Sequence, residues 1–311
     1  MKSRVTLSFY AATVLSPALL GPASAQNRTI PDVLVFEQPG NQWFEALYTS
    51  GSVSNDGNSV LFSGLHGVQL YSLATGREDA NFAGGLDQIY SAIFCGPGAL
   101  ARRGRRGSEN GWFLPGGEMA LLSLPHNGVV ACSADGSKIA YVDVSEKVQR
   151  LFIRTRGNLS SHALSERATA TTSMSFSPDG GMLYYLVFEP SMEASFVGIA
   201  AQTGISRIIA RHLDACPWSS HIEVAPDGKH AYLVLASDGA PNNEARHQPD
   251  ASRWLKIYEI DLVTGGRRRI VDLPGTDNTS PIIAKDNLFW TRTLFRGSIA
   301  WSQWPAERGR K

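Results

Sequence analysis

The stretch Ser173–Phe188, SMSFSPDGGMLYYLVF, contains two strand patterns separated by a tight turn. Before the turn, serines alternate with Met174 and Phe176, which is the period-two pattern of a half-buried strand. The pair Asp179-Gly180 favours a turn, because the aspartate side chain can accept hydrogen bonds from the backbone just ahead and glycine adopts positive φ at no steric cost. Met182–Phe188 is almost entirely apolar, as in a strand covered on both faces. The stretch therefore predicts a β-hairpin inside a larger sheet structure.

The same pattern, an Asp-Gly turn followed by an apolar strand, occurs four times, with the aspartates at Asp56, Asp135, Asp179 and Asp227. The last three are 44 and 48 residues apart, and the first gap of 79 residues has room for two repeats. Weaker copies at 94–100 and 283–290 fit the same spacing. A period of about 40–50 residues that contains only strands is typical of the blades of a β-propeller.

We expect an all-β, six-bladed β-propeller, with seven blades as the alternative if the weak second blade is wrongly divided. The last blade has three strand patterns, 281–284, 288–293 and 298–304, where four are needed. The strand Asp32–Phe36 ahead of the first repeat is the natural fourth, because its pairing with the last blade removes exposed sheet edges. The expected propeller domain covers residues 26–311.

Residues 1–25 predict a secretory signal peptide. Lys2 and Arg4 precede an apolar run over Val5–Leu20, and Ala23–Ala25 provides a small-residue cleavage site. The alternative is a membrane-anchoring helix, but polar residues and a proline interrupt the run, which is short for a membrane span. We expect the mature protein to be soluble and either periplasmic or secreted, with no transmembrane segment.

The charge balance argues against nucleic acid or an anionic membrane as the main partner. The whole chain has 29 basic and 28 acidic residues and a formal net charge of +1. Removal of residues 1–25 takes away two basic residues and no acid, so the net charge of the remainder is −1. We expect a monomer.

The three cysteines are an odd number for an exported protein. Cys95 and Cys132 both fall on the first strand of neighbouring predicted blades, which allows a disulfide between them. Buried free thiols for these two and for Cys216 are the favoured interpretation, because cysteine behaves as a small hydrophobic residue without any special geometry. The spacing fits no zinc motif.

Two segments are predicted to decorate one face of the propeller. The arginine-rich segment 102–111 is interpreted as a loop between the second and third strands of blade two, and 237–252 is a longer insertion at the equivalent place in blade five. Such loops lie on the face opposite the Asp-Gly turns. They could bind carboxylates, phosphates or a partner protein, and the alternative is that they are solvated, flexible loops. The candidate binding residues are Arg102, Arg103, Arg105, Arg106, Asn242, Glu244, Arg246, His247 and Trp254.

Ser-Pro-Asp-Gly followed by an apolar strand, in repeated copies, resembles the WD-repeat-like propellers of TolB and of the N-terminal domains of the prolyl oligopeptidase and dipeptidyl-peptidase IV group. The resemblance covers nearly all of the mature chain and is specific for the fold rather than for the function. In those peptidases an α/β-hydrolase domain follows the propeller, whereas this sequence has no Gly-x-Ser-x-Gly elbow. No catalytic residue is therefore carried over, and no cofactor is predicted.

Two sets of residues in the sequence could suggest a metal site. His66, His221 and His247 are expected on one face and could hold a metal with an open coordination position, although chance surface histidines explain them as well. The Asp-Gly aspartates are better interpreted as turn residues than as calcium ligands, because calcium needs six to eight oxygens around one centre.

The sequence thus favours an exported propeller that acts as a protein- or ligand-binding scaffold in the cell envelope. One alternative is a lactonase- or lyase-like propeller enzyme with a polar or metal site at the mouth of its central channel. A second is a stand-alone peptidase-type propeller that gates a separate hydrolase.

Overall fold

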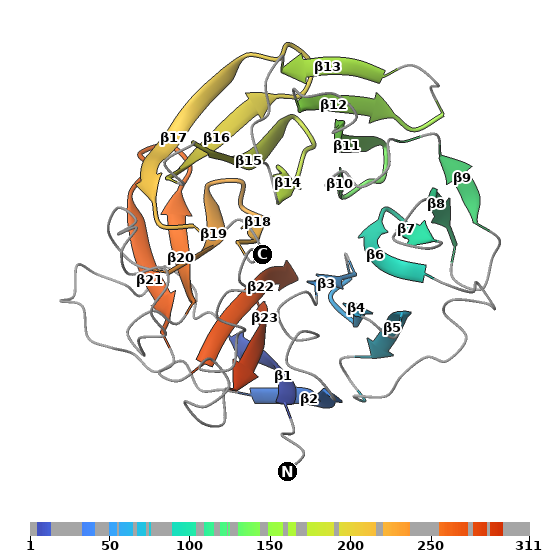
Figure 1. Cartoon of the computed structure of the whole chain (residues 1–311), viewed down its shortest axis with the longest axis vertical. Coiled ribbons are helices and arrows are strands. Elements are labelled where there is room, and N and C mark those ends of the chain that lie inside the picture. Colours follow the sequence, from blue (N-terminus) through green and yellow to red (C-terminus); the bar gives the residue numbers. More distant parts are fainter. Residues whose placement is uncertain are drawn as a thin grey trace, which may run out of the picture.

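The computed structural model describes residues 5–13, 33–40, 50–54, 56–64, 67–72, 75, 89–103, 109–114, 119–122, 124, 130–143, 149–157, 161–165, 173–189, 193–215, 220–236, 255–272, 276–284 and 287–294. These residues form β-strands and turns, and the strands belong to six antiparallel sheets arranged around a centre (Figure 1). No helix in this described part has the length and apolarity to cross a membrane.

Five of the sheets are built from consecutive strands, each antiparallel to the next. They are β3–β5 (Ser50–Val53, Ser59–Gly64, Gly67–Ser72), β6–β9 (Ile89–Cys95, Gly98–Arg103, Glu109–Phe113, Ala120–Leu122), β10–β13 (Val130–Cys132, Lys138–Asp143, Arg150–Thr155, Ser161–Ser165), β14–β17 (Met174–Phe176, Met182–Phe188, Ala194–Ala200, Ser206–Leu213) and β18–β21 (Ile222–Val224, His230–Leu235, Lys256–Asp261, Arg267–Val271). The hairpin predicted at Ser173–Phe188 is confirmed as β14 and β15.

The sixth sheet combines the two ends of the described chain. Its order is β2-β1-β23-β22, with β1 at Val5–Thr13, β2 at Val33–Gly40, β22 at Thr276–Ala284 and β23 at Asn287–Leu294. The sequence predicted one N-terminal strand here, whereas the sheet holds two, and β2 reaches β23 only through β1. The apolar run of residues 5–13 explains this, since it can form a strand as well as a leader. The predicted strand 298–304 lies outside the described residues.

The first strands of the sheets form a closed ring at the centre. β3, β6, β10, β14, β18 and β22 contact one another in this order, and β22 contacts β3 (Figure 1). Each sheet therefore radiates outward from the ring as a blade, and the prediction of an all-β propeller is confirmed.

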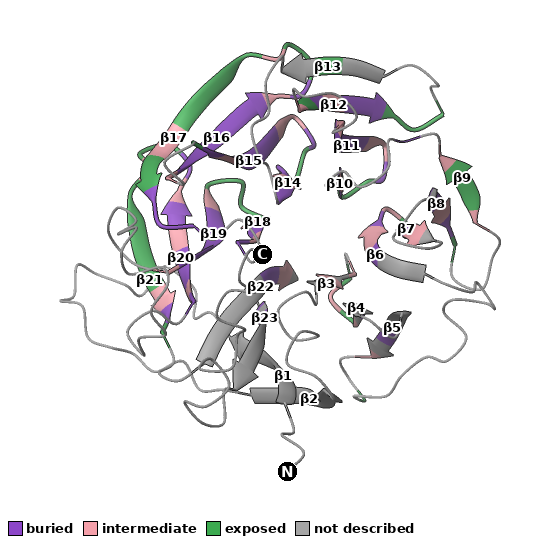
Figure 2. Cartoon of the chain, viewed as in Figure 1, coloured by how far each residue is buried: buried purple, intermediate pink, exposed green. Residues whose placement is uncertain are grey.

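The hydrophobic core lies between neighbouring blades. The largest cluster packs Leu186 and Phe196 of β14–β17 against Leu233 and Tyr258 of β18–β21, all nearly without exposed surface. Further clusters lie between β3–β5 and β6–β9, between β6–β9 and β10–β13, between β10–β13 and β14–β17, and between β18–β21 and the last sheet. Figure 2 shows buried residues on the inner and middle strands and exposed residues on the outer strands β17 and β21. Burial on both faces explains why the middle strands are almost uniformly apolar.

The Asp-Gly turns are closed by the side chains of the repeated motif. Ser177 Oγ donates to Asp179 Oδ1 at 2.5 Å, the Gly181 N–H donates to the same oxygen at 2.9 Å, and Gly180 has a φ of 64°. Equivalent bonds close the turns of Ser54–Asn58 and Ser133–Ser137. The carboxylates are thus occupied within their own turns, which confirms their interpretation as turn residues. Among the described residues no group of three His, Cys, Asp or Glu could hold a metal ion.

The prediction of a loop over residues 102–111 is wrong. β7 continues to Arg103 and β8 begins at Glu109, with Arg102 opposite Asn110 and Arg103 opposite Glu109. The connection between these strands is therefore residues 104–108. The two arginines Arg102 and Arg103 are therefore part of the hairpin ladder instead of ending it.

Candidate functional site

Hydroxyl groups join neighbouring strands of the central ring. Ser52 Oγ on β3 accepts a hydrogen bond from the Phe94 N–H on β6 at 3.0 Å. Ser175 Oγ on β14 accepts one from the Val224 N–H on β18 at 3.2 Å. Such bonds are needed because the first strand of each blade is a sheet edge, whose backbone groups have no strand partner on the inner side.

The residues that accept these bonds between blades, called seam residues below, occupy one position of the repeat, four residues before the turn aspartate. The four clear copies have Ser52, Ala131, Ser175 and Glu223 at this position. Glu223 makes the same kind of contact as the serines, because its carboxyl group accepts a hydrogen bond from the backbone N–H of Ile283 on β22. Blade five therefore has an ionisable group where the other three clear copies have a small residue.

His221 and Glu223 lie on the same side of one strand, since they are two residues apart. Their neighbours Ser220, Ile222 and Val224 are buried, whereas both of these side chains remain partly exposed. Burial lowers the pKa of His221 to about 4. Burial also raises the pKa of Glu223 to about 8, although the hydrogen bond from the Ile283 N–H by itself lowers the pKa of this carboxyl group. Both shifts favour the uncharged form of the side chain near neutral pH.

The inner strands β6 and β10 carry apolar residues that pack between blades. Phe94 on β6 packs against a cluster that includes Leu61 and Leu70 of the neighbouring blade. Ile93 on β6 and Val130 and Cys132 on β10 pack against the cluster between their own two blades. Figure 1 shows β6 and β18 on opposite sides of the centre. His221 and Glu223 therefore give the β18 side of the ring ionisable groups that Ile93, Phe94, Val130 and Cys132 do not provide on β6 and β10.

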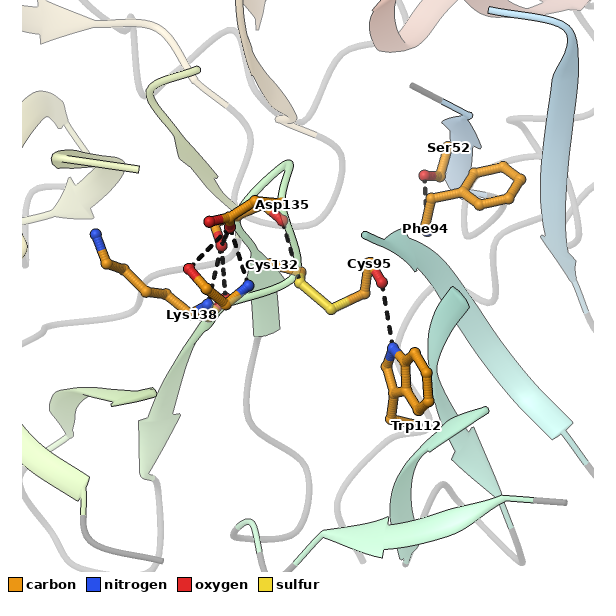
Figure 3. Close-up of a disulfide and its surroundings, with 9 residues drawn as sticks. Ser52, Phe94, Cys95, Trp112, Cys132, Asp135 and Lys138 are labelled. Atoms are coloured by element: carbon orange, nitrogen blue, oxygen red, sulfur yellow. Dashed lines mark hydrogen bonds between the residues drawn. A yellow bond between two sulfur atoms is a disulfide. The ribbon is translucent and has the colours of Figure 1, made fainter. Parts of the chain in front are cut away.

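A disulfide between Cys95 and Cys132 joins the two apolar inner strands, with Cα atoms 5.4 Å apart (Figure 3). The prediction of free thiols for these two residues is wrong, because neighbouring inner strands approach closely enough for a bridge. The turns that follow these two strands also lie close together, because a Cβ on Gly96 would lie 2.8 Å from the backbone oxygen of Asp135. Trp112 Nε1 donates to the Cys95 backbone oxygen at 3.2 Å. Disulfides are typical of proteins in oxidising compartments.

The geometry of the ring and its blades can be compared with known proteins. No protein-family model matches the chain, and no curated protein matches its sequence. Among solved structures, a TolB-type protein from Agrobacterium tumefaciens superposes with a TM-score of 0.68, at 14% identity, over 94% of this chain and 99% of that chain. The fold is that of a TolB-like β-propeller.

This TolB-like propeller is also similar to Kuenenia stuttgartiensis hydrazine synthase, with a TM-score of 0.53 and 15% identity over 76% of this chain and 70% of that chain. TolB from Acinetobacter baumannii gives a TM-score of 0.45 and 13% identity over 76% of this chain and 60% of that chain. The match to the Agrobacterium tumefaciens protein establishes the fold, and at 14% identity any function must be argued from particular residues.

Two of the predicted site residues have described side chains in the TolB-like propeller. His221 lies in the central ring, and Arg102 lies on β7 with its Nε and Nη2 atoms buried. Arg103 ends β7. The other candidates lie outside the described residues, so the structure does not bring the three histidines together or separate them. They are His66, Arg105, Arg106, Asn242, Glu244, Arg246, His247 and Trp254.

The residue that sequence reasoning missed is Glu223. Its signal is present in the repeat, because alignment on the turn aspartates places it in register with Ser52, Ala131 and Ser175. A comparison of repeat positions, rather than a search for motifs, would have singled it out in this TolB-like propeller.

Proposed function

We propose that this protein is an exported scaffold that binds a protein or a small ligand in the cell envelope. The supporting observation is the direction of the strands. β19 ends at Leu235 and β20 begins at Lys256, so the chain between them starts and finishes at the edge of the propeller opposite the Asp-Gly turns. His221 lies at the same edge, just before β18. Segments held by a rigid scaffold are the usual place for recognition.

The proposed binding face carries the β7–β8 connection, residues 104–108, and the β19–β20 connection, residues 236–255. Arg105, Arg106 and Arg246 are the cations that we assign to recognition of an acidic partner, since guanidinium groups bind carboxylates through two parallel hydrogen bonds.

The periplasm is the proposed location. The Cys95–Cys132 disulfide agrees with an oxidising compartment, and residues 1–25 have the pattern of a leader. We propose that the exported form keeps six blades and that an N-terminal strand closes the last one. Because β1 falls inside the predicted leader, the predicted strand 298–304 would take its place beside β23 after cleavage. N-terminal sequencing of the exported protein tests the cleavage site.

The scaffold proposal is tested by capture from envelope extract with tagged protein. We expect one partner to be recovered by the wild type, and recovery by a triple Arg105→Ser, Arg106→Ser, Arg246→Ser variant to fall by about tenfold at low salt and by less at high salt. The matched control is Lys229→Ser, an exposed cation on the opposite face. Equal recovery by the triple variant contradicts the assigned face. Turnover in a hydrolase and lactonase screen, without any captured partner, favours the enzyme alternative.

A further inference from the structure

The exposed large apolar side chains of the described chain gather at one edge of the blades. In a four-stranded antiparallel blade, the turn between the third and fourth strands lies at the same edge as the Asp-Gly turn, because successive strands alternate in direction. Within the described residues, every exposed large apolar side chain lies in such a turn or near the start of the fourth strand. These residues, called the rim residues below, are Leu114, Leu121, Ile205, Ile208 and Val263.

Ile205 and Val263 are the most exposed of the rim residues, at 72% and 76%. They lie in the β16–β17 turn and the β20–β21 turn of two neighbouring blades. The Leu262 N–H donates to the backbone oxygen of Lys229, beside the Asp-Gly turn of its own blade, at 2.8 Å, and the β16–β17 turn makes the equivalent bond at 2.9 Å. Both apolar side chains are therefore held on the Asp-Gly face by hydrogen-bonded turns.

The backbone N–H groups of these two turns have acceptors within the turns. The Ile205 N–H donates to Thr203 Oγ1 at 3.3 Å, and the Val263 N–H donates to Asp261 Oδ1 at 2.9 Å. In each turn the glycine N–H also donates to a carbonyl oxygen at the end of the preceding strand, at 2.9 Å. Backbone amides that carry their own acceptors can leave water at little cost.

Arginines accompany the rim residues. Arg207 and Arg267 are exposed near the starts of β17 and β21, and the exposed Arg156 follows the third strand of blade three. Arg267 makes no ion pair with an acid in the described part of the chain. Asp261 lies at the same edge, where its carboxylate accepts two N–H groups of its own turn. The outer edge of the Asp-Gly face thus combines exposed apolar side chains with cations.

The rim residues are spread over the width of the propeller. Figure 1 shows β9, next to which Leu114 lies, across the centre from β17 and β21, and Figure 2 shows exposed residues on these three outer strands. A partner that contacts Leu114, Ile205 and Val263 together must be flat and as wide as the propeller. A protein partner usually buries one continuous patch, whereas a membrane surface is flat and attracts apolar and cationic side chains without a matching pocket.

We propose that the Asp-Gly face of the propeller binds reversibly to the surface of a phospholipid membrane that contains anionic lipids. Ile205 and Val263 enter the boundary between headgroups and acyl chains, and the arginines pair with lipid phosphates. The net charge near zero gives the whole molecule no general attraction to such a surface, so binding depends on the rim. This face lies opposite the proposed binding face, so the inference goes beyond the scaffold function and leaves the arginine-bearing connections free for a partner.

The test is flotation, with vesicles, of the protein as it is recovered from expressing cells. The vesicles are either phosphatidylcholine alone or an about 3:1 mixture of phosphatidylcholine and phosphatidylglycerol. We expect the protein to float with the mixed vesicles at low salt, and to float less with phosphatidylcholine alone and at high salt, because salt screens the attraction between the arginines and the lipid.

Variants identify the rim as the surface that binds. The double change Ile205→Ser and Val263→Ser should lower the partition coefficient by at least about tenfold, because it removes two apolar side chains from the interface. Its control is Gln202→Ser, which removes an exposed polar side chain from the same turn as Ile205 and should bind like the wild type.

The contribution of charge is measured with a matched pair of arginine variants. Arg267→Gln should lower the partition coefficient by about fivefold. Arg211→Gln removes an exposed cation near the other end of β17, and should change the partition coefficient by less than about twofold.

Three results overturn the inference. They are no flotation of the wild type with the mixed vesicles, equal flotation of the Ile205→Ser, Val263→Ser variant, and loss by this variant of a dimer or of a captured protein partner without any binding of vesicles by the wild type. Thermal unfolding of the double variant at the wild-type temperature confirms that the variant is folded. If vesicle binding fails while partner capture persists, the membrane site is wrong and the scaffold function stands. Loss of partner capture by the triple arginine variant, with intact vesicle binding, supports two separate faces.

Discussion

The hydroxyl group of Ser175 accepts a hydrogen bond from the backbone N–H of Val224, 3.2 Å away, and so joins the inner strands of two neighbouring blades. Ser52 and Glu223 make the same connection at two other junctions. Neighbouring blades are therefore held together by packing between their faces and also by polar bonds along the inner edge.

Ser175→Ala should destabilise the protein by about 1–2 kcal/mol, because it leaves the Val224 N–H without this acceptor in a partly buried place. The measurement is urea unfolding followed by tryptophan fluorescence. Ser206→Ala, on the exposed outer strand β17, is the control and should change the free energy of unfolding by less than about 0.5 kcal/mol. Equal effects of the two changes would show that the seam bond contributes nothing.

Removal of the disulfide by Cys95→Ser and Cys132→Ser together should cost roughly 3–4 kcal/mol, since the bridge closes a loop with a sequence separation of 37 residues. Guanidinium unfolding with and without a reducing agent provides the measurement and its own control. The reductant should lower the stability of the wild type and leave the double variant unchanged. A wild type that is insensitive to reductant under unfolding conditions contradicts the bridge.

Gly265→Ala should be more destabilising than Gly157→Ala. Both glycines have positive φ, 73° and 83°, so alanine is strained by about 1–2 kcal/mol at either position. Only at Gly265 does the added Cβ meet the neighbouring blade, 2.1 Å from the backbone oxygen of Ile209, whereas nothing lies within 4 Å at Gly157. Thermal unfolding of both variants measures the difference. Similar losses would mean that the two blades are not packed as closely as described.

The free energy of unfolding should depend on pH on both the acid and the alkaline side, because His221 and Glu223 in the inner ring have pKa values shifted in opposite directions. The pKa of Glu223 is raised from 4.5, the ordinary value, to about 8 in the folded protein. The stabilisation that this group gives the folded state is therefore fully present below pH 4.5 and is lost as the pH rises through 8. The pKa of His221 is lowered from 6.5, the ordinary value, to about 4 in the folded protein. The stabilisation that this group gives the folded state is therefore present above pH 6.5 and is lost as the pH falls through 4. Glu223→Gln should remove the alkaline loss, and His221→Gln should remove the acid loss.

Urea unfolding of the wild type and of both variants at about pH 4, 6 and 8.5 measures these contributions. Each variant serves as the control for the other, because each should alter only one limb of the profile. Parallel profiles for all three proteins would mean that neither side chain changes its ionisation on folding.

The hairpins and the propeller could be predicted from the sequence because their signals are local. Ser177, Asp179 and Gly180 close their turn with bonds that span a few residues, and Met182–Phe188 is apolar because both of its faces are covered. Repetition of such a unit at a regular spacing leaves few folds other than a propeller. The turn role of the aspartates followed from the same local chemistry.

Features that depend on contacts between strands, within one blade or between two, could not be predicted in the same way. The pairing of Cys95 with Cys132 depends on how closely β6 and β10 approach, which packing of the whole blades decides. The position of Arg102 in β7 depends on its cross-strand partner Asn110, which propensity alone does not reveal. The unusual ionisation of Glu223 arises from burial among neighbouring strands, and no motif encodes it.

Strands from both ends of the chain share the last sheet, and this arrangement delays the completion of folding. β1 can pair with β23 only after residues near position 290 have left the ribosome, so the circle stays open throughout synthesis. Contacts of such large sequence separation also form slowly. Closure of the circle of blades is therefore the last event that the order of the strands along the chain allows.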